Sequence, residues 1–235
     1  MRIGSIQRIV RYPVKSMRGE ELGTAELGFQ GIPGDRRYAF VQTGSQSLFP
    51  WLTARQLPQL LLYRPSYPAP SSQSAPIVET PAGVSLAVDS EELRQELEAA
   101  SGRGLFLLRD HRGNYYVAPV SLFSLATGEG IASESITLPE PDRFRANLYL
   151  ETEDGIPFGE RRWVGRVLRI GASARIGVTE PDERCIMVNL NPLTGEASPA
   201  VFRSIAQSHN ASAGVYGVVL TPGSIQPGEP IQLED

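Results

Sequence analysis

Short apolar runs separated by glycine and proline are the main pattern of this chain. Runs at 36–42, 167–178 and 214–220 are rich in β-branched and aromatic residues and are bounded by turn formers, which is typical of strands. Near the C-terminus, Pro222-Gly223 and Pro227-Gly228 separate short apolar stretches, as expected for tight turns in a β-barrel. The pattern therefore predicts a mainly β protein.

Helical signals are confined to three short segments. Residues 91–100 begin with acidic side chains, and either Asp89 or Ser90 can cap their first turn. A second candidate covers 199–209, where the leading proline suits the first helical position. A third, shorter one opens at a proline and covers 119–125. We therefore expect few helices, all of them short.

Composition divides the chain into two predicted domains. Residues 63–76 are rich in proline and serine and predict an exposed loop. A boundary near 110–118 falls between the first and third candidate helices. We expect an N-terminal β domain over 1–110 and a β-barrel domain with short helices over 111–235.

Charge and cysteine content exclude several classes of protein. The formal net charge of −4 gives no general attraction to nucleic acid or to anionic membranes. Arginines interrupt the apolar stretch at the N-terminus, and no run approaches the roughly 20 apolar residues that cross a bilayer. A single cysteine argues against a disulfide-stapled secreted protein. We expect a soluble, cytoplasmic protein with no nucleic-acid or membrane partner.

Two groups of basic residues are candidates for anion binding. Lys15, the only lysine, and Ser16 follow a predicted strand, and Arg36 follows a glycine-rich turn; such groups suit a phosphate. Alternatively, Arg36 pairs with Asp35 or with another surface carboxylate. In the second group Arg143, Arg145 and Asn147 alternate, which in a strand would place all three on one face as an anion clamp. The alternative there is a solvated edge strand protected by its charges.

Cys185 follows an arginine, which favours the thiolate. It is an inert buried residue, a nucleophile, or a single thiolate ligand to a metal that is held mainly by something else. Only two histidines, His111 and His209, could assist it, and neither lies in a hydrolase signature or at zinc-ligand spacing.

Eight segments, in order along the chain, together resemble the MOSC family (molybdenum cofactor sulfurase C-terminal domain) in the form that carries an N-terminal MOSC β-barrel domain. This group includes the mitochondrial amidoxime-reducing component and the YcbX-like bacterial proteins. The segments are YPVKSM, GIPGDRRY, LTARQLPQL, APVSLFSLAT, RFRANL, PFGERRWVG, ERCIMVNLNPLTGE and PGSIQPGE. The resemblance implies that 1–110 is the N-terminal β-barrel domain and 111–235 the MOSC domain.

The resemblance also implies a cofactor and its site. The cofactor would be molybdenum held by a pterin dithiolene, with Cys185 as the catalytic thiolate on the metal; the family is also associated with pyridoxal phosphate binding. Positions that match cofactor-binding positions of the family are Lys15, Ser16, Arg36, Thr127, Arg143, Arg145 and Asn147. Thr127 stands where the family usually has serine. The family's common acidic pair before the tryptophan is Glu160-Arg161 here, so one carboxylate is missing.

By this resemblance the protein would be an oxidoreductase that reduces N-hydroxylated small molecules such as hydroxylamines or amidoximes. One cysteine cannot hold an iron–sulfur cluster, so the electrons would come from a separate reductase or ferredoxin-type protein. One alternative is a carrier of the cofactor, or of sulfur as a persulfide on Cys185. Another is an interaction domain without cofactor.

Overall fold

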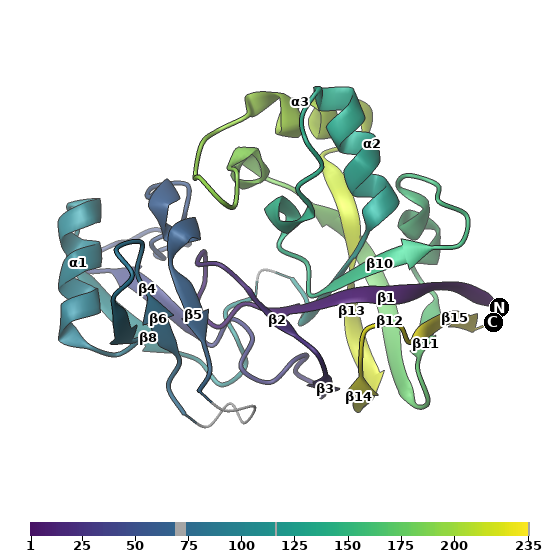
Figure 1. The fold of residues 1–235 in the computed structure, drawn as a ribbon, viewed down its shortest axis with the longest axis horizontal. Coiled ribbons are helices and arrows are strands. Elements are labelled where there is room, and N and C mark those ends of the chain that lie inside the picture. Colours follow the sequence, from purple (N-terminus) through teal and green to yellow (C-terminus); the bar gives the residue numbers. More distant parts are fainter. Residues whose placement is uncertain (69–73, 116, 235) are drawn as a thin grey trace.

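The computed structural model describes residues 1–68, 74–115 and 117–234. Within them the chain forms fifteen strands and three helices (Figure 1). The strands are β1 (Arg2–Arg11), β2 (Glu20–Leu22), β3 (Ala25–Leu27), β4 (Tyr38–Gln42), β5 (Arg64–Ser66), β6 (Ile77–Glu79), β7 (Ser85–Ala87), β8 (Leu105–Arg109), β9 (Val120–Ser124), β10 (Leu148–Thr152), β11 (Val167–Ile170), β12 (Ala174–Glu183), β13 (Ser212–Thr221), β14 (Gly223–Ile225) and β15 (Pro230–Glu234). The helices are α1 (Glu91–Ser101), α2 (Leu125–Ser135) and α3 (Pro199–Ser208).

Seven strands form a closed barrel. Their order is β10-β9-β13-β12-β11-β15-β1, and β1 pairs with β10 to complete the circle. Closure leaves the barrel without an open edge that could pair with another chain. The short strand β2 extends the sheet from β1.

Adjacent residues of the barrel strands belong to two hydrophobic cores, one inside the barrel and one between the barrel and the helices. Ile9, Leu122 and Leu148 are fully buried in the barrel interior. Their neighbours Val10, Phe123 and Tyr149 belong to a second cluster, together with residues of α3. Because successive side chains of a strand point to opposite faces, one stretch of sequence supplies both the interior and the surface that the helices cover. Figure 1 shows α2 and α3 packed on the barrel at the top of the view.

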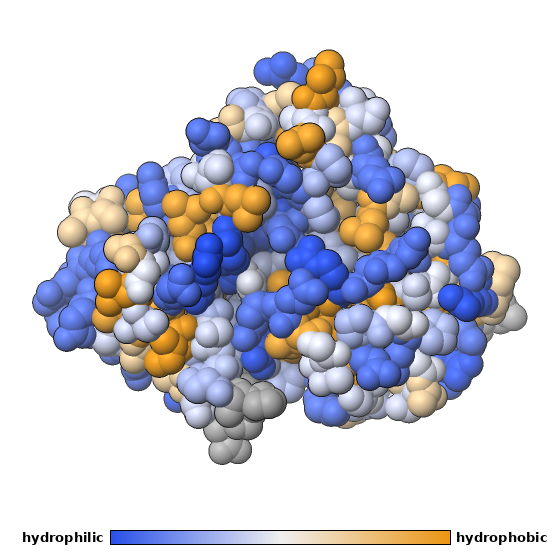
Figure 2. All heavy atoms as spheres, in the orientation of Figure 1, coloured by the Kyte–Doolittle hydropathy of each residue, from blue (hydrophilic) through white to orange (hydrophobic). Residues whose placement is uncertain are grey.

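A smaller lobe lies beside the barrel. It contains the antiparallel pair β4–β8, the three-stranded sheet β5-β6-β7 and helix α1 (Figure 1, left). Leu93 and Leu97 of α1 are completely buried against Phe40 and its neighbours. On the face shown in Figure 2, hydrophobic side chains form small separate groups among hydrophilic ones. No helix in the described part of the chain is long and apolar enough to span a membrane.

The prediction of a mainly β protein with a few short helices is confirmed. Ser90 caps α1 by accepting a hydrogen bond from the amide of Leu93, and α3 begins at Pro199 as expected. The predicted run 167–178 lies in β11 and β12, which pair across a tight turn.

Three local predictions are wrong. The segment predicted as a helix from 119 is mostly strand β9, and the helix begins only at Leu125. Arg143 and Arg145 do not lie in a strand, because Pro141–Phe144 is a 3₁₀ turn and β10 starts later. Of the loop predicted at 63–76, residues 64–66 form β5 and Tyr67 is buried, whereas 69–73 lie outside the described residues.

The division near residue 110 stays a prediction. Strand β1 precedes this point in the sequence, yet it completes the barrel whose other six strands all follow it. The main chain of β1 contacts β10 and β15 over most of its length. The barrel is thus built from both parts of the chain.

We expect a fragment of residues 110–235 to lack a cooperative thermal transition, because without β1 the edges of β10 and β15 are unpaired and the interior is open. Circular dichroism melting of this fragment, beside the complete chain, measures this. Cooperative melting of the fragment would show that the second part folds without β1.

Candidate functional site

A cavity of about 130 Å³ lies where the end of β1, the segment before β10 and the end of β12 meet. It brings together seven of the eight residues that the sequence predicted. The predicted residues that line it are Lys15, Ser16, Arg36, Arg143, Arg145, Asn147 and Cys185. The side chains of this wall therefore come from segments that are far apart in the sequence.

Lys15 is held at the cavity by contacts on both its main chain and its side chain. Its amide donates to the carbonyl of Tyr38, and its Nζ donates to the carbonyl of Asn114 at 2.9 Å. The ammonium also lies 4.7 Å from the ring centre of Trp51. Burial, and then the nearby guanidinium groups of Arg36 and Arg145, lower the pKa of Lys15 to about 7. Its charge at the cavity is thus sensitive to pH near neutrality.

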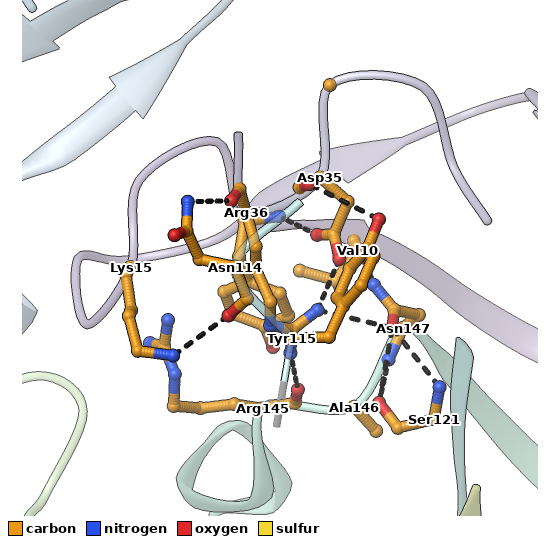
Figure 3. A network of polar contacts seen from close by, with 12 residues as sticks. Val10, Lys15, Asp35, Arg36, Asn114, Tyr115, Ser121, Arg145, Ala146 and Asn147 are labelled. Atoms are coloured by element: carbon orange, nitrogen blue, oxygen red, sulfur yellow. Dashed lines mark hydrogen bonds and ion pairs between the residues drawn. The ribbon is translucent and has the colours of Figure 1, made fainter. Parts of the chain in front are cut away.

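Arg36 and Arg145 form a linked pair beside Lys15 (Figure 3). Arg36 forms an ion pair with the buried Asp35 and donates to the carbonyl of Arg145 at 2.8 Å. Arg145 donates to the carbonyl of Met17 at 2.7 Å, and among the described residues it has no carboxylate partner. Burial opposes the charge of Arg36, but Asp35 raises its pKa; burial and the proximity of Arg36 lower the pKa of Arg145. Positive charge is therefore concentrated here without full compensation.

Three of these residues have left-handed backbone conformations. The φ angles are 66° for Ser16, 50° for Arg36 and 50° for Arg145. This region is unfavourable for residues that carry a Cβ, at a cost on the order of 1–2 kcal/mol each. Such strain is common at binding sites, where the surrounding structure holds a side chain in one direction.

Asn147 and Arg143 hold the wall of the cavity together. The Oδ1 of Asn147 accepts from Ser121 and from Arg36, and its Nδ2 donates to the carbonyl of Val10. Arg143 pairs with Glu140 and donates to the carbonyl of Asn189 at 2.8 Å, in the turn that follows Cys185. The Nε of Arg143 is buried without a hydrogen-bond partner among the described residues. Both side chains line the cavity while they fix neighbouring segments.

Cys185 is exposed, which excludes the alternative of an inert buried cysteine. It lies directly before the 3₁₀ turn Ile186–Asn189, and its carbonyl accepts a hydrogen bond from Val188. Arg184 fixes the approach to the thiol, since it donates to the carbonyls of Phe144 and Ala213. The thiol is therefore accessible at the same cavity as the cationic groups.

Among the cavity residues that sequence reasoning missed, Asp182 and Tyr216 carry titratable side chains that contact one another. Asp182 is buried, lies 2.6 Å from Nη2 of Arg184, and accepts a hydrogen bond from Tyr216. Burial raises the pKa of Asp182 to about 6, although Arg184 opposes the shift. The only signal in the sequence was a carboxylate three positions before the cysteine.

Thr127 does not line this cavity. Its hydroxyl donates to the buried carboxylate of Glu160 and accepts from the amide of Phe158 at 2.7 Å. Burial raises the pKa of Glu160, and the threonine hydroxyl is among the groups that oppose this shift. Arg161, at the position of the missing carboxylate, donates to the carbonyls of His209 and Ser212. These contacts join α2 to the segments that cover the barrel.

The donor groups fit a phosphorylated ligand that brings its own metal. Among the described residues no group of three or more histidine, cysteine or acidic side chains could hold a metal ion. A metal at Cys185 would thus need most of its ligands from a cofactor. The cationic groups and the unpartnered Nε of Arg143 offer donors to an anion. The cavity is smaller than the roughly 300–1,000 Å³ of typical ligand pockets, so part of a large cofactor would lie outside it.

Comparison with known proteins places the chain in a family. The model of the MOSC N-terminal beta barrel domain matches residues 3–107, and the model of the MOSC domain matches residues 110–232. A molybdenum cofactor sulfurase of Drosophila grimshawi is 28% identical over 247 positions, which cover 87% of this chain and 31% of the relative. One from Drosophila mojavensis is 42% identical over 77 positions, 32% of this chain and 9% of the relative.

This chain therefore spans about a third of the length of the first of these relatives and less of the second. Among solved structures, the YuaD protein of Bacillus subtilis has a TM-score of 0.53 at 14% identity, and the match covers 98% of this chain and 95% of that one. At this identity the likeness shows a shared fold. The domain match, which covers more than half of the sequence, shows that this chain belongs to the MOSC domain family, a family associated with the molybdenum cofactor.

Proposed function

We propose that this protein binds the molybdenum cofactor in the cavity at Cys185 and acts as an oxidoreductase on N-hydroxylated small molecules. One observation carries the proposal: a cationic site and an exposed thiol share one cavity. A phosphorylated metal cofactor needs both an anion site and a soft ligand.

The phosphate end of the cofactor would be held by the cationic groups. Arg36 and Arg145 present guanidinium groups, and Lys15 adds an ammonium whose pKa an anion would raise. The hydroxyl of Ser16 lies on the same wall and can donate to an oxyanion. The positive charge of the pair Arg36–Arg145 would then be compensated by the ligand.

Cys185 would be the protein's ligand to molybdenum. A thiolate is a soft ligand, and the exposure of Cys185 leaves this side of the site open to a substrate. When bound, the cofactor would supply the redox chemistry of the reduction. Asp182 and Tyr216 line the same cavity and could move a proton there.

The electrons would come from a separate protein of the reductase or ferredoxin type. These 235 residues contain one cysteine, which the metal would occupy, so no iron–sulfur cluster can be built from them. The exposed position of Cys185 would let such a partner approach the metal.

A second candidate is a carrier module that delivers the cofactor or bears sulfur as a persulfide on Cys185. The similarity to molybdenum cofactor sulfurases and the exposure of the thiol favour it. A carrier would bind cofactor but show no turnover with an electron donor, whereas the oxidoreductase would reduce a hydroxylamine or an amidoxime.

We expect the protein from a host that makes molybdopterin to contain about one molybdenum per chain and to reduce benzamidoxime with an artificial electron donor. Cys185→Ser should lose this activity at least about 100-fold, because an alcohol is a poor ligand to a soft metal site. Metal analysis and amine formation measure the two properties. Leu193→Ser, a polar substitution at an exposed apolar residue, is the control. A wild-type protein without molybdenum would contradict the proposal.

Two substitutions of Arg145 should have the same effect on anion binding but different effects on the stability of the fold. Both Arg145→Ala and Arg145→Gly should bind sulfate about tenfold more weakly, but the glycine variant should be about 1 kcal/mol more stable than the alanine variant because it relieves the left-handed φ. Calorimetric titration and denaturant unfolding measure both. Ile136→Gly, at an exposed left-handed residue outside the cavity, should gain stability without loss of binding. Equal stability of the two Arg145 variants would argue against strain.

Sulfate affinity should fall as pH rises above about 7. In the free protein the pKa of Lys15 is about 7, and a bound anion raises it. Above pH 7, binding must therefore take up a proton, which lowers the affinity by up to about tenfold per pH unit until the pKa of the complex is reached. Titrations between pH 6 and 9 measure this. Lys15→Arg, which keeps its charge, should show a flatter profile; identical profiles would contradict the role of Lys15.

A further inference from the structure

Tyr12, at the end of β1, lies against both arginines of the cationic site. The guanidinium carbon of Arg36 is 4.9 Å from the centre of its ring, and that of Arg145 is 4.4 Å away. Both distances are within the roughly 6 Å over which a cation is attracted to an aromatic face. The ring is almost fully buried.

The main chain of Tyr12 is tied to the same site. Its amide donates to Oδ1 of Asp35 at 2.7 Å, and its carbonyl accepts from the amide of Arg36 at 2.6 Å. Asp35 in turn forms the ion pair with Arg36. Residue 12 thus fixes the backbone of Arg36, the counter-ion of Arg36 and the side chains of both arginines.

The hydroxyl of Tyr12 anchors the ring. It lies 3.2 Å from the hydroxyl of Tyr149, which donates to the carbonyl of Pro141 and accepts from the amide of Ala146. Ala146 directly follows the left-handed Arg145. The two tyrosines therefore connect the ring beneath the arginines to the backbone that directs Arg145.

The charges of the two arginines explain why an aromatic ring between them and the core is useful. Arg36 and Arg145 repel one another, and Asp35 is the carboxylate that pairs with one of them. Burial raises the pKa of Tyr12 to about 12, so the phenol stays neutral and is not a second counter-ion. Each guanidinium also donates to a main-chain carbonyl, and the ring of Tyr12 adds an attraction for both cations at once before a ligand arrives.

We propose that Tyr12 is the positioning residue of the anion site: its aromatic face holds Arg36 and Arg145 together in the orientation that receives an oxyanion. It acts through the arginines and need not touch the ligand. The inference rests on the proposed function only for the identity of that ligand, because any oxyanion that binds the two arginines would depend on the ring.

The test changes the negative charge on the face of the ring at position 12 while it keeps the shape of the ring. Tyr12→Phe and the same position with difluoro- and trifluorophenylalanine give a series in which fluorine weakens the negative face. Inorganic sulfate is the probe, titrated by calorimetry, and the melting temperature checks the fold. Tyr12→Phe loses the hydroxyl contact with Tyr149 but keeps the buried ring, so it should bind within about twofold of wild type. Affinity should then fall stepwise to a loss of about tenfold with trifluorophenylalanine.

A double-mutant cycle separates positioning from general packing. Tyr12→Leu should weaken sulfate binding about tenfold in the wild-type background and have little effect on the residual binding of an Arg36→Ala, Arg145→Ala variant. A flat fluorine series, or a wild type that does not bind sulfate, would overturn the inference.

If wild type binds sulfate through Tyr12 but never contains molybdenum, the proposed function fails and the inference stands. If wild type contains molybdenum and the series is flat, only the inference fails.

Discussion

The pairing of β1 with β10 is the contact on which both the barrel and the cavity depend. It closes the circle of strands and leads directly to Tyr12, which lies against the two arginines, and to Lys15, which lines the cavity. The amide of Val10 donates to the carbonyl of Asn147, whose side chain returns a hydrogen bond to Val10. Because Asn147 also accepts from Arg36, the same side chain that locks the strand register orients the cationic site. Fold and site therefore share their most important hydrogen bonds.

The cavity is organised at some expense of stability. Ser16, Arg36 and Arg145 have strained backbones, and burial disfavours the charges of Lys15 and Arg145. Conformational strain and charge repulsion of this kind are relieved when a ligand of opposite charge binds, and a site prepared in this way loses little entropy on binding. Before a ligand binds, the hydrogen bonds among Asp35, Arg36 and Asn147 hold the site in this arrangement.

Local elements could be predicted from the sequence because their signals are local. The cap at Ser90 and the proline at the start of α3 needed only neighbouring residues. Arg143 and Arg145 were correctly grouped for an incorrect reason, since alternation suggested a strand where a 3₁₀ turn ends in a left-handed residue. The grouping of Lys15, Arg36, Arg145 and Cys185 came from family resemblance. Tyr12 and Asp182 were missed because only long-range contacts give them their environment, and Thr127 is occupied by Glu160.

The pairing of β1 with β15 also sets the order in which the molecule can form. Arg2 faces Gln232, so two strands at opposite ends of the described chain must meet before the circle is complete. During synthesis β1 leaves the ribosome long before β10 and β15 exist, and its apolar side chains have no interior to enter. Contacts of such high sequence separation make folding slow. The smaller lobe around α1 is held by contacts between residues that lie closer together in the sequence. It is therefore able to fold before β1 has strands to pair with.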